Sequence, residues 1–175
     1  QTKLKSLRKK NMKLANDFEA TINNWDEGIY ITEEQAEAFP QTYTDQLTFD
    51  KKKRQYRVTL DYPQLIPFMR ICPDELLRKE MSELVGQKGG KKNLQRLKDI
   101  VKVKTEIAQI LGYKDFAEMN LVNKMAKTPE TVIKFIDKNI EKYFEKGQSE
   151  LDVLRYAKER SGSKKKLAGY DVSYY

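Results

Sequence analysis

Apolar side chains recur every three or four positions along most of the chain, which is the period of an α-helix with one buried face. The first such line runs from Leu4 to Trp25 and predicts a long amphipathic helix that ends at about Gly28. The same spacing, bounded by capping residues, Gly or Pro, predicts further helices over residues 32–39, 64–70, 73–88, 94–111, 115–122 and 128–154.

Two of these helices carry specific expectations. In the helix over residues 94–111, the apolar line consists of Leu94, Leu97, Val101, Ala108 and Leu111. The helix over residues 128–154 has a clear start, because Thr128 can cap it, a proline follows at the first helical position, and an acid lies in the first turn.

One stretch has a different period. Tyr56, Val58 and Leu60 alternate with polar residues, which is typical of a β-strand. We predict one small β-hairpin near residues 43–61, with its charged turn at residues 50–54. The expected fold is therefore mainly α: residues 1–175 form a single lobe of long amphipathic helices with this hairpin.

The charge pattern leaves two interpretations open. The chain has a net charge of +8, but its 34 basic and 26 acidic residues are interleaved, as expected for a solvated surface. The clusters at residues 51–54 and 164–166 could instead bind nucleic acid or another acidic partner. The first interpretation predicts no nucleic-acid partner, and the second predicts a stand-alone basic module.

Composition also bears on location. The single cysteine, Cys72, excludes an internal disulfide and favours a reducing compartment. No apolar run approaches the roughly 18 residues that span a bilayer, so no membrane partner is expected. We expect a cytoplasmic protein, and an exported parent whose signal has been removed stays open as an alternative.

The sequence offers few groups for catalysis. It contains no histidine, so by itself it cannot form a histidine-ligated zinc site or a histidine-based triad. The glycine-rich stretch at residues 86–92 lacks the Ser or Thr of a phosphate-binding loop and predicts an interhelical turn. The acidic pairs at residues 33–34 and 74–75 lie at helix starts, where they complement the helix dipole. We therefore predict no catalytic, cofactor-binding or metal-binding residue.

The end of the chain is unusually apolar. Residues 169–175 contain three tyrosines and a valine, which would expose apolar surface at a free end. Either this segment packs back on the domain, or the natural chain continues beyond it.

Several stretches resemble, in the same order, the thimet oligopeptidase family of zinc metallopeptidases, which includes oligopeptidase F and the peptidyl-dipeptidases. The stretches that carry the resemblance are residues 56–69, 76–79, 93–97, 106–118, 124–130 and 170–175. The last of these is similar to the family's "WDvsYY" segment, with Tyr170 in place of tryptophan. Residues 86–92 and 103–105 depart from the family pattern, which leaves the subfamily open.

The resemblance implies a function for a larger parent protein. In this family the zinc motif His-Glu-x-x-His and a further glutamate ligand lie downstream of the "WDvsYY" segment, so this chain is expected to be an N-terminal fragment without catalytic apparatus. Zinc is expected in the missing catalytic domain, which would be the chain's partner. The chain itself would form a wall of the channel that admits short peptide substrates, and alone it would be inactive.

Overall fold

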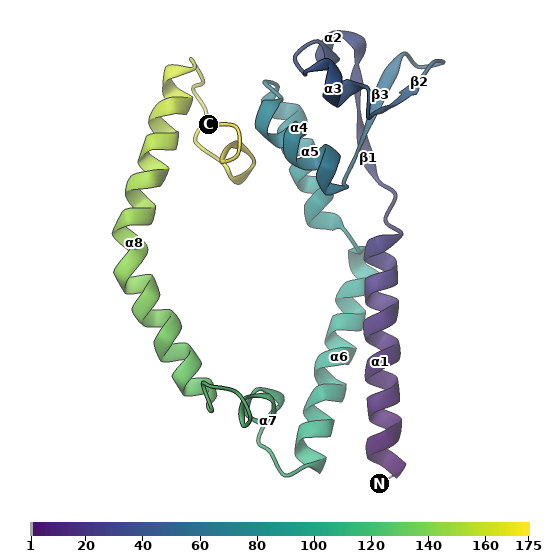
Figure 1. The fold of residues 1–175 in the computed structure, drawn as a ribbon, viewed down its shortest axis with the longest axis vertical. Helices are drawn as coiled ribbons and strands as arrows, with labels where there is room; N and C mark the ends of the chain where they lie inside the picture. The colour runs from purple at the N-terminus through teal and green to yellow at the C-terminus, as the bar shows by residue number, and fades with distance from the viewer. Residues whose placement is uncertain (1) are drawn as a thin grey trace. The chain divides into compact units, whose positions relative to one another are not determined.

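The computed structural model describes residues 2–175, which form helices joined by short loops and one small sheet (Figure 1). Contacts divide the chain into two compact units, residues 2–25 with Gly89–Gly147, and Asp26–Lys88 with Gln148–Tyr175. The expected fold class, mainly α with a small β-hairpin, is confirmed. Within residues 2–175, no helix is both long enough and apolar enough to cross a bilayer.

The first unit consists of helices α1 (Thr2–Asn23), α6 (Gly90–Ile110), α7 (Phe116–Leu121) and the first half of α8 (Pro129–Arg160). Helices α1 and α6 lie side by side and run in opposite directions (Figure 1). Polar side chains join them. Asn93 Nδ2 donates to the carbonyl oxygen of Phe18 at 3.0 Å, and Arg96 Nη1 donates to Thr21 Oγ1 at 2.5 Å.

The starts of α7 and α8 are those expected from the sequence. Asp115 Oδ1 accepts a hydrogen bond from the backbone N–H of Glu118 at 2.9 Å, and Thr128 Oγ1 accepts one from Thr131 at 3.2 Å. Each bond satisfies an N–H that has no partner within its helix. Helix α8 continues through Gly147 without a break.

The apolar line predicted for residues 94–111 is buried only in part. Leu94, Leu97, Val101 and Leu111 are 56%, 48%, 56% and 41% exposed, whereas Ala108 of this line is buried, as are Asn93 and Val103 outside it. Helix α6 carries two apolar lines, and periodicity alone does not tell which of them packs inward. Asn93, which is buried, donates a hydrogen bond to α1, so its side of α6 faces α1.

The second unit contains a three-stranded antiparallel sheet, ordered β1-β3-β2, with strands β1 (Gly28–Thr32), β2 (Thr48–Asp50) and β3 (Gln55–Thr59). Strands β2 and β3 form the predicted hairpin, with the charged turn at residues 51–54. Strand β1 was not predicted. Its Ile29 pairs with Val58 of β3, and both side chains are at most 1% exposed.

Two boundaries in this region differ from the prediction. Helix α1 ends at Asn23, and Gly28 begins β1 instead of ending the helix. A Cβ atom at Gly28 would lie 2.4 Å from the carbonyl oxygen of Val58, so the close approach of β3 requires glycine there. Tyr43 and Thr44 fall within the range predicted for the hairpin but lie in a short helix, α3 (Gln41–Thr44). The hairpin itself begins at β2.

The remaining elements of this unit are α2 (Glu33–Ala36), α4 (Tyr62–Ile71), α5 (Glu75–Gln87), the last turns of α8 and the 3-10 helix η1 (Gly169–Asp171). The predicted capping box at the start of α2 is present, although the helix ends earlier than expected. Helix α4 packs on β3, and α5 packs on β1 and α4. Phe68 of α4 and Met81 of α5 are fully buried, so the two helices share this core.

Candidate functional site

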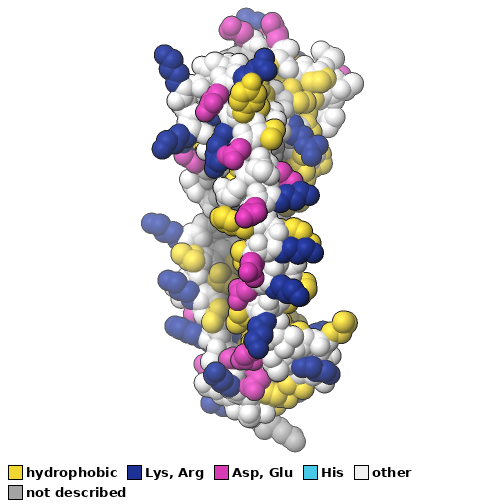
Figure 2. All heavy atoms as spheres, turned by 90° about the vertical axis from the view of Figure 1, so that its left-hand side faces the viewer, with side chains coloured by type: hydrophobic (Ala, Val, Ile, Leu, Met, Phe, Trp, Pro, Cys, Tyr) yellow, Lys and Arg dark blue, Asp and Glu magenta, His cyan; other side chains and the backbone are white. Residues whose placement is uncertain are grey.

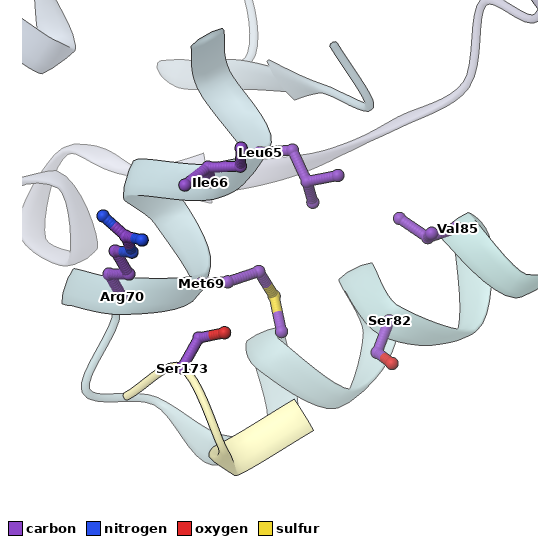
Figure 3. A pocket seen from close by; sticks show the side chains of 7 residues that line it. All are labelled: Leu65, Ile66, Met69, Arg70, Ser82, Val85 and Ser173. Atoms are coloured by element: carbon purple, nitrogen blue, oxygen red, sulfur yellow. The ribbon is translucent and has the colours of Figure 1, made fainter. Parts of the chain in front are cut away.

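A cavity of about 340 Å³ lies in the second unit between α4, α5 and the C-terminal tail, residues 169–175 (Figure 3). It is lined by Leu65, Ile66, Met69 and Arg70 of α4, Ser82 and Val85 of α5, and Ser173 of the tail. The α4 residues recur at helical spacing, which places them along one side of that helix.

The lining of this cavity suits binding better than catalysis. Three of its α4 side chains are apolar, and the guanidinium of Arg70 adds one positive charge. Such a site can hold an apolar group with a nearby negative charge.

A second arrangement in the same unit consists of four charged side chains, Glu75, Arg78, Lys158 and Asp171, which we call the Asp171 cluster. Asp171 Oδ1 accepts a hydrogen bond from Arg78 Nη2, and Asp171 Oδ2 accepts one from Lys158 Nζ, each at 2.7 Å. Glu75 Oε1 lies 3.6 Å from Lys158 Nζ. The side chains of Arg78, Lys158 and Asp171 are at most 1% exposed, so this is a buried ionic network.

Further contacts tie the tail to this cluster. The backbone N–H of Ala168 donates to Asp171 Oδ2 at 2.9 Å. Arg78 Nη1 donates to the carbonyl oxygen of Cys72 at 2.8 Å, and its guanidinium carbon lies 4.1 Å from the ring centre of Tyr174. The tail therefore packs back on its own unit, an arrangement that is compatible with a chain that continues beyond it.

Burial and ion pairing act in opposite directions on the two central groups. Burial favours the neutral acid, but the hydrogen bonds from Lys158 and Arg78 outweigh it and hold the pKa of Asp171 below its ordinary value. Burial also disfavours the ammonium of Lys158, yet the bond and charge of Asp171, with the charge of Glu75, raise the pKa of Lys158. Both groups therefore stay charged at neutral pH.

The Asp171 cluster was not found by sequence reasoning, although one signal pointed to it. Lys158 follows Leu151 by seven residues and Leu154 by four, so it falls within an apolar line of α8. A charged residue at such a position needs an ionic partner once it is buried. Arg78 and Asp171 both lay within the stretches that carried the family resemblance, but nothing local indicated that they pair.

The other features singled out in the sequence have structural roles. Asp74 Oδ1 accepts hydrogen bonds from the first N–H groups of α5, and Glu33 Oε1 lies 2.7 Å from Arg54 Nε. Within the stretch at residues 86–92, only residues 88 and 89 form the turn between α5 and α6, where Gly89 has a φ of +87°, and the other residues lie in the two helices. The acidic pairs thus lie at helix starts, and the glycine-rich stretch contains an interhelical turn, as predicted from the sequence.

The two basic clusters lie in different structural settings. Residues 51–54 form the turn between β2 and β3. In the second cluster, Lys165 Nζ lies 3.4 Å from Glu75 Oε1, and the carbonyl oxygen of Lys166 accepts a hydrogen bond from Lys158 Nζ at 3.1 Å. The second cluster is thus partly engaged in contacts within its own unit.

The residues of this chain do not fit the zinc that the family resemblance implies. There is no histidine, and the Cys72 thiol is buried. Burial raises the pKa of that thiol to about 11, which disfavours the thiolate that binds metal. Within the part of the chain that the structure describes, no group of three or more Cys, Asp or Glu side chains could hold a metal ion.

Comparison with known proteins identifies relatives of this chain. The sequence model of peptidase family M3 matches residues 68–175. Saccharolysin of Saccharomyces cerevisiae is 32% identical over 178 residues, which cover 99% of this chain and 25% of saccharolysin. Oligopeptidase A of Haemophilus influenzae is 31% identical over 128 residues, covering 69% of this chain and 19% of that protein.

A third relative extends the range of similar peptidases. The mitochondrial intermediate peptidase of Aspergillus niger is 35% identical over 107 residues, covering 61% of this chain and 13% of that protein. The chain thus spans a quarter or less of the length of these relatives.

Proposed function

Because this chain belongs to peptidase family M3, we propose that it is the helical, N-terminal lobe of a larger zinc-dependent oligopeptidase that hydrolyses short peptides. The observation that carries this proposal is the similarity to saccharolysin over 99% of the chain, together with the family match over residues 68–175. The lobe itself contributes no catalytic group. The zinc ligands belong to a catalytic domain that follows residue 175 and is the partner of this lobe.

The proposed role of the lobe is to form one wall of the channel through which peptides reach the catalytic domain. A cavity with apolar walls, an arginine and two hydroxyl groups, as between α4, α5 and the tail, supports a surface that contacts peptide side chains. The Asp171 cluster supports the same role, because a buried ionic network holds the tail against α5. We place the parent in the cytoplasm, the reducing compartment that the single cysteine of this chain favours.

The proposal is tested with the purified full-length parent and with the chain of residues 1–175 alone. The parent should cleave short fluorogenic peptides, lose that activity in a zinc chelator and regain it when zinc is restored. It should leave folded proteins intact, and the chain alone should show no turnover with or without zinc. A parent that cleaves no peptide under these conditions, or a chain that turns over alone, contradicts the proposal.

A second assay addresses the alternative of a basic module that binds acidic partners. Binding driven by lysine–phosphate contacts must strengthen as salt concentration falls. Retention of the chain on nucleic acid at low salt, lost steeply as salt is added, would favour that alternative. The proposed function expects no retention.

A further inference from the structure

Helix α8 carries a line of apolar side chains that stay about half exposed in the described part of the chain. Ile133, Ile136, Ile140 and Tyr143 follow one another at intervals of three, four and three residues, and we call them the α8 stripe. Their exposures are 57%, 48%, 57% and 52%. The interval places all four on one side of the helix.

The α8 stripe differs from the scattered apolar residues of an ordinary protein surface. The opposite side of the same helix segment is charged, with Lys134, Lys138, Glu141, Lys142 and Glu145. Charged side chains are spread along the face of α8 that Figure 2 turns toward the viewer. A helix with one apolar and one charged side normally buries the apolar side, and a continuous exposed apolar line marks an interaction surface.

We propose that the α8 stripe is the docking surface for the polypeptide that follows residue 175 in the parent, which would cover it with an apolar helix face. The inference rests on the proposed function, since it takes its partner from the larger peptidase. The relatives leave ample chain for this role, because the present chain accounts for 25% of saccharolysin and 19% of oligopeptidase A.

The last residues of the chain lie at the end of the same helix. The hydroxyl groups of Ser161 and Tyr175 lie 2.9 Å apart, and Lys158 Nζ donates to the carbonyl oxygen of Lys166 at 3.1 Å. Residues after Tyr175 therefore begin beside the C-terminal end of α8.

Cysteine labelling in the full-length parent tests this docking. The native thiol at Cys72 is buried, so an introduced cysteine can be followed by mass spectrometry of its own peptide. Ile140→Cys reports on the α8 stripe, and Lys138→Cys is the matched control on the opposite side of the helix. Ile133→Cys serves as a second reporter, with thermal unfolding as the check that each variant folds.

We expect Ile140→Cys and Ile133→Cys in the native parent to react at least about tenfold more slowly than Lys138→Cys, and all three to react alike in denaturant. Equal native rates at all three positions would overturn the inference. Protection that appears in residues 1–175 alone and grows with protein concentration would also overturn it, since a second copy would then cover the stripe.

The outcome is separable from that of the proposed function. Peptide hydrolysis is measured on the same variants and the unmodified parent. An inactive parent with a protected stripe supports the docking and contradicts the peptidase assignment. An active parent with a freely labelled stripe contradicts the docking alone.

Discussion

Asp171 Oδ1 accepts a hydrogen bond from Arg78 Nη2 at 2.7 Å, although the two residues are 93 positions apart in the sequence. The bond joins the C-terminal tail to helix α5, and Lys158 of α8 completes the contact at the other carboxylate oxygen. A buried carboxylate between two buried cations is stable only while all three groups are present. This relationship makes the stability of the second unit sensitive to substitution of Asp171.

Asp171→Asn removes the negative charge and leaves Arg78 and Lys158 buried beside each other. We expect this variant to lose about 3–5 kcal/mol of unfolding free energy, as is typical when one partner of a buried ion pair is removed. Urea unfolding followed by circular dichroism measures the change. Asp152→Asn is the matched control, since its pair with Arg155 is exposed and should contribute less than about 1 kcal/mol. Equal effects of the two variants would show that the Asp171 cluster stabilises nothing.

The stabilisation from the Asp171 cluster should depend on pH at both extremes. The pKa of Asp171 is lowered on folding, so its contribution is complete above the ordinary aspartate pKa of about 3.9 and is lost as pH falls through the lower, folded pKa. The pKa of Lys158 is raised, so its contribution is complete below about 10.4 and is lost as pH rises through the higher, folded pKa.

The measurement is the difference in unfolding free energy between the wild-type chain and Asp171→Asn as a function of pH. It should be flat between about pH 4 and pH 10 and shrink on either side. A difference that changes steadily through neutral pH would contradict the assignment of these two groups as charged.

Features set by neighbouring residues could be predicted from the sequence. The caps at Asp115 and Thr128 lie within three residues of the N–H groups they satisfy, and the alternation around Val58 is local as well. Strand β1 escaped prediction because its partner β3 lies far along the chain. The pairing of Arg78 with Asp171 could not be predicted for the same reason, because no local sequence pattern indicates which distant charged residues will be in contact.

Gly28→Ala should destabilise the second unit. The added Cβ would lie 2.4 Å from the carbonyl oxygen of Val58, so β1 must move away from β3, at a cost of about 1–3 kcal/mol. Thermal unfolding checks this. Gly86→Ala in α5 is the control, because no atom lies within 4 Å of its new Cβ, and it should stabilise the helix by about 0.5–1 kcal/mol. A neutral Gly28→Ala variant would argue against the close approach of the two strands.

The Cys72 thiol should be almost inert in the native chain. Burial raises its pKa to about 11, so at pH 8 its thiolate is about 200-fold rarer than that of a thiol with the ordinary pKa. Reaction with a chromogenic disulfide at pH 8, followed in buffer and in urea, measures the protection. Comparable native and unfolded rates would show that Cys72 is accessible.

We propose above that this chain forms a wall of a peptide channel in a larger peptidase. Photo-crosslinking tests it most directly, with a short substrate peptide that carries a photoreactive side chain and the full-length parent, chelated so that it does not turn over. The account predicts crosslinks to residues within 2–175, competed away by unlabelled peptide. Crosslinks confined to the sequence after residue 175, at saturating peptide, would contradict it.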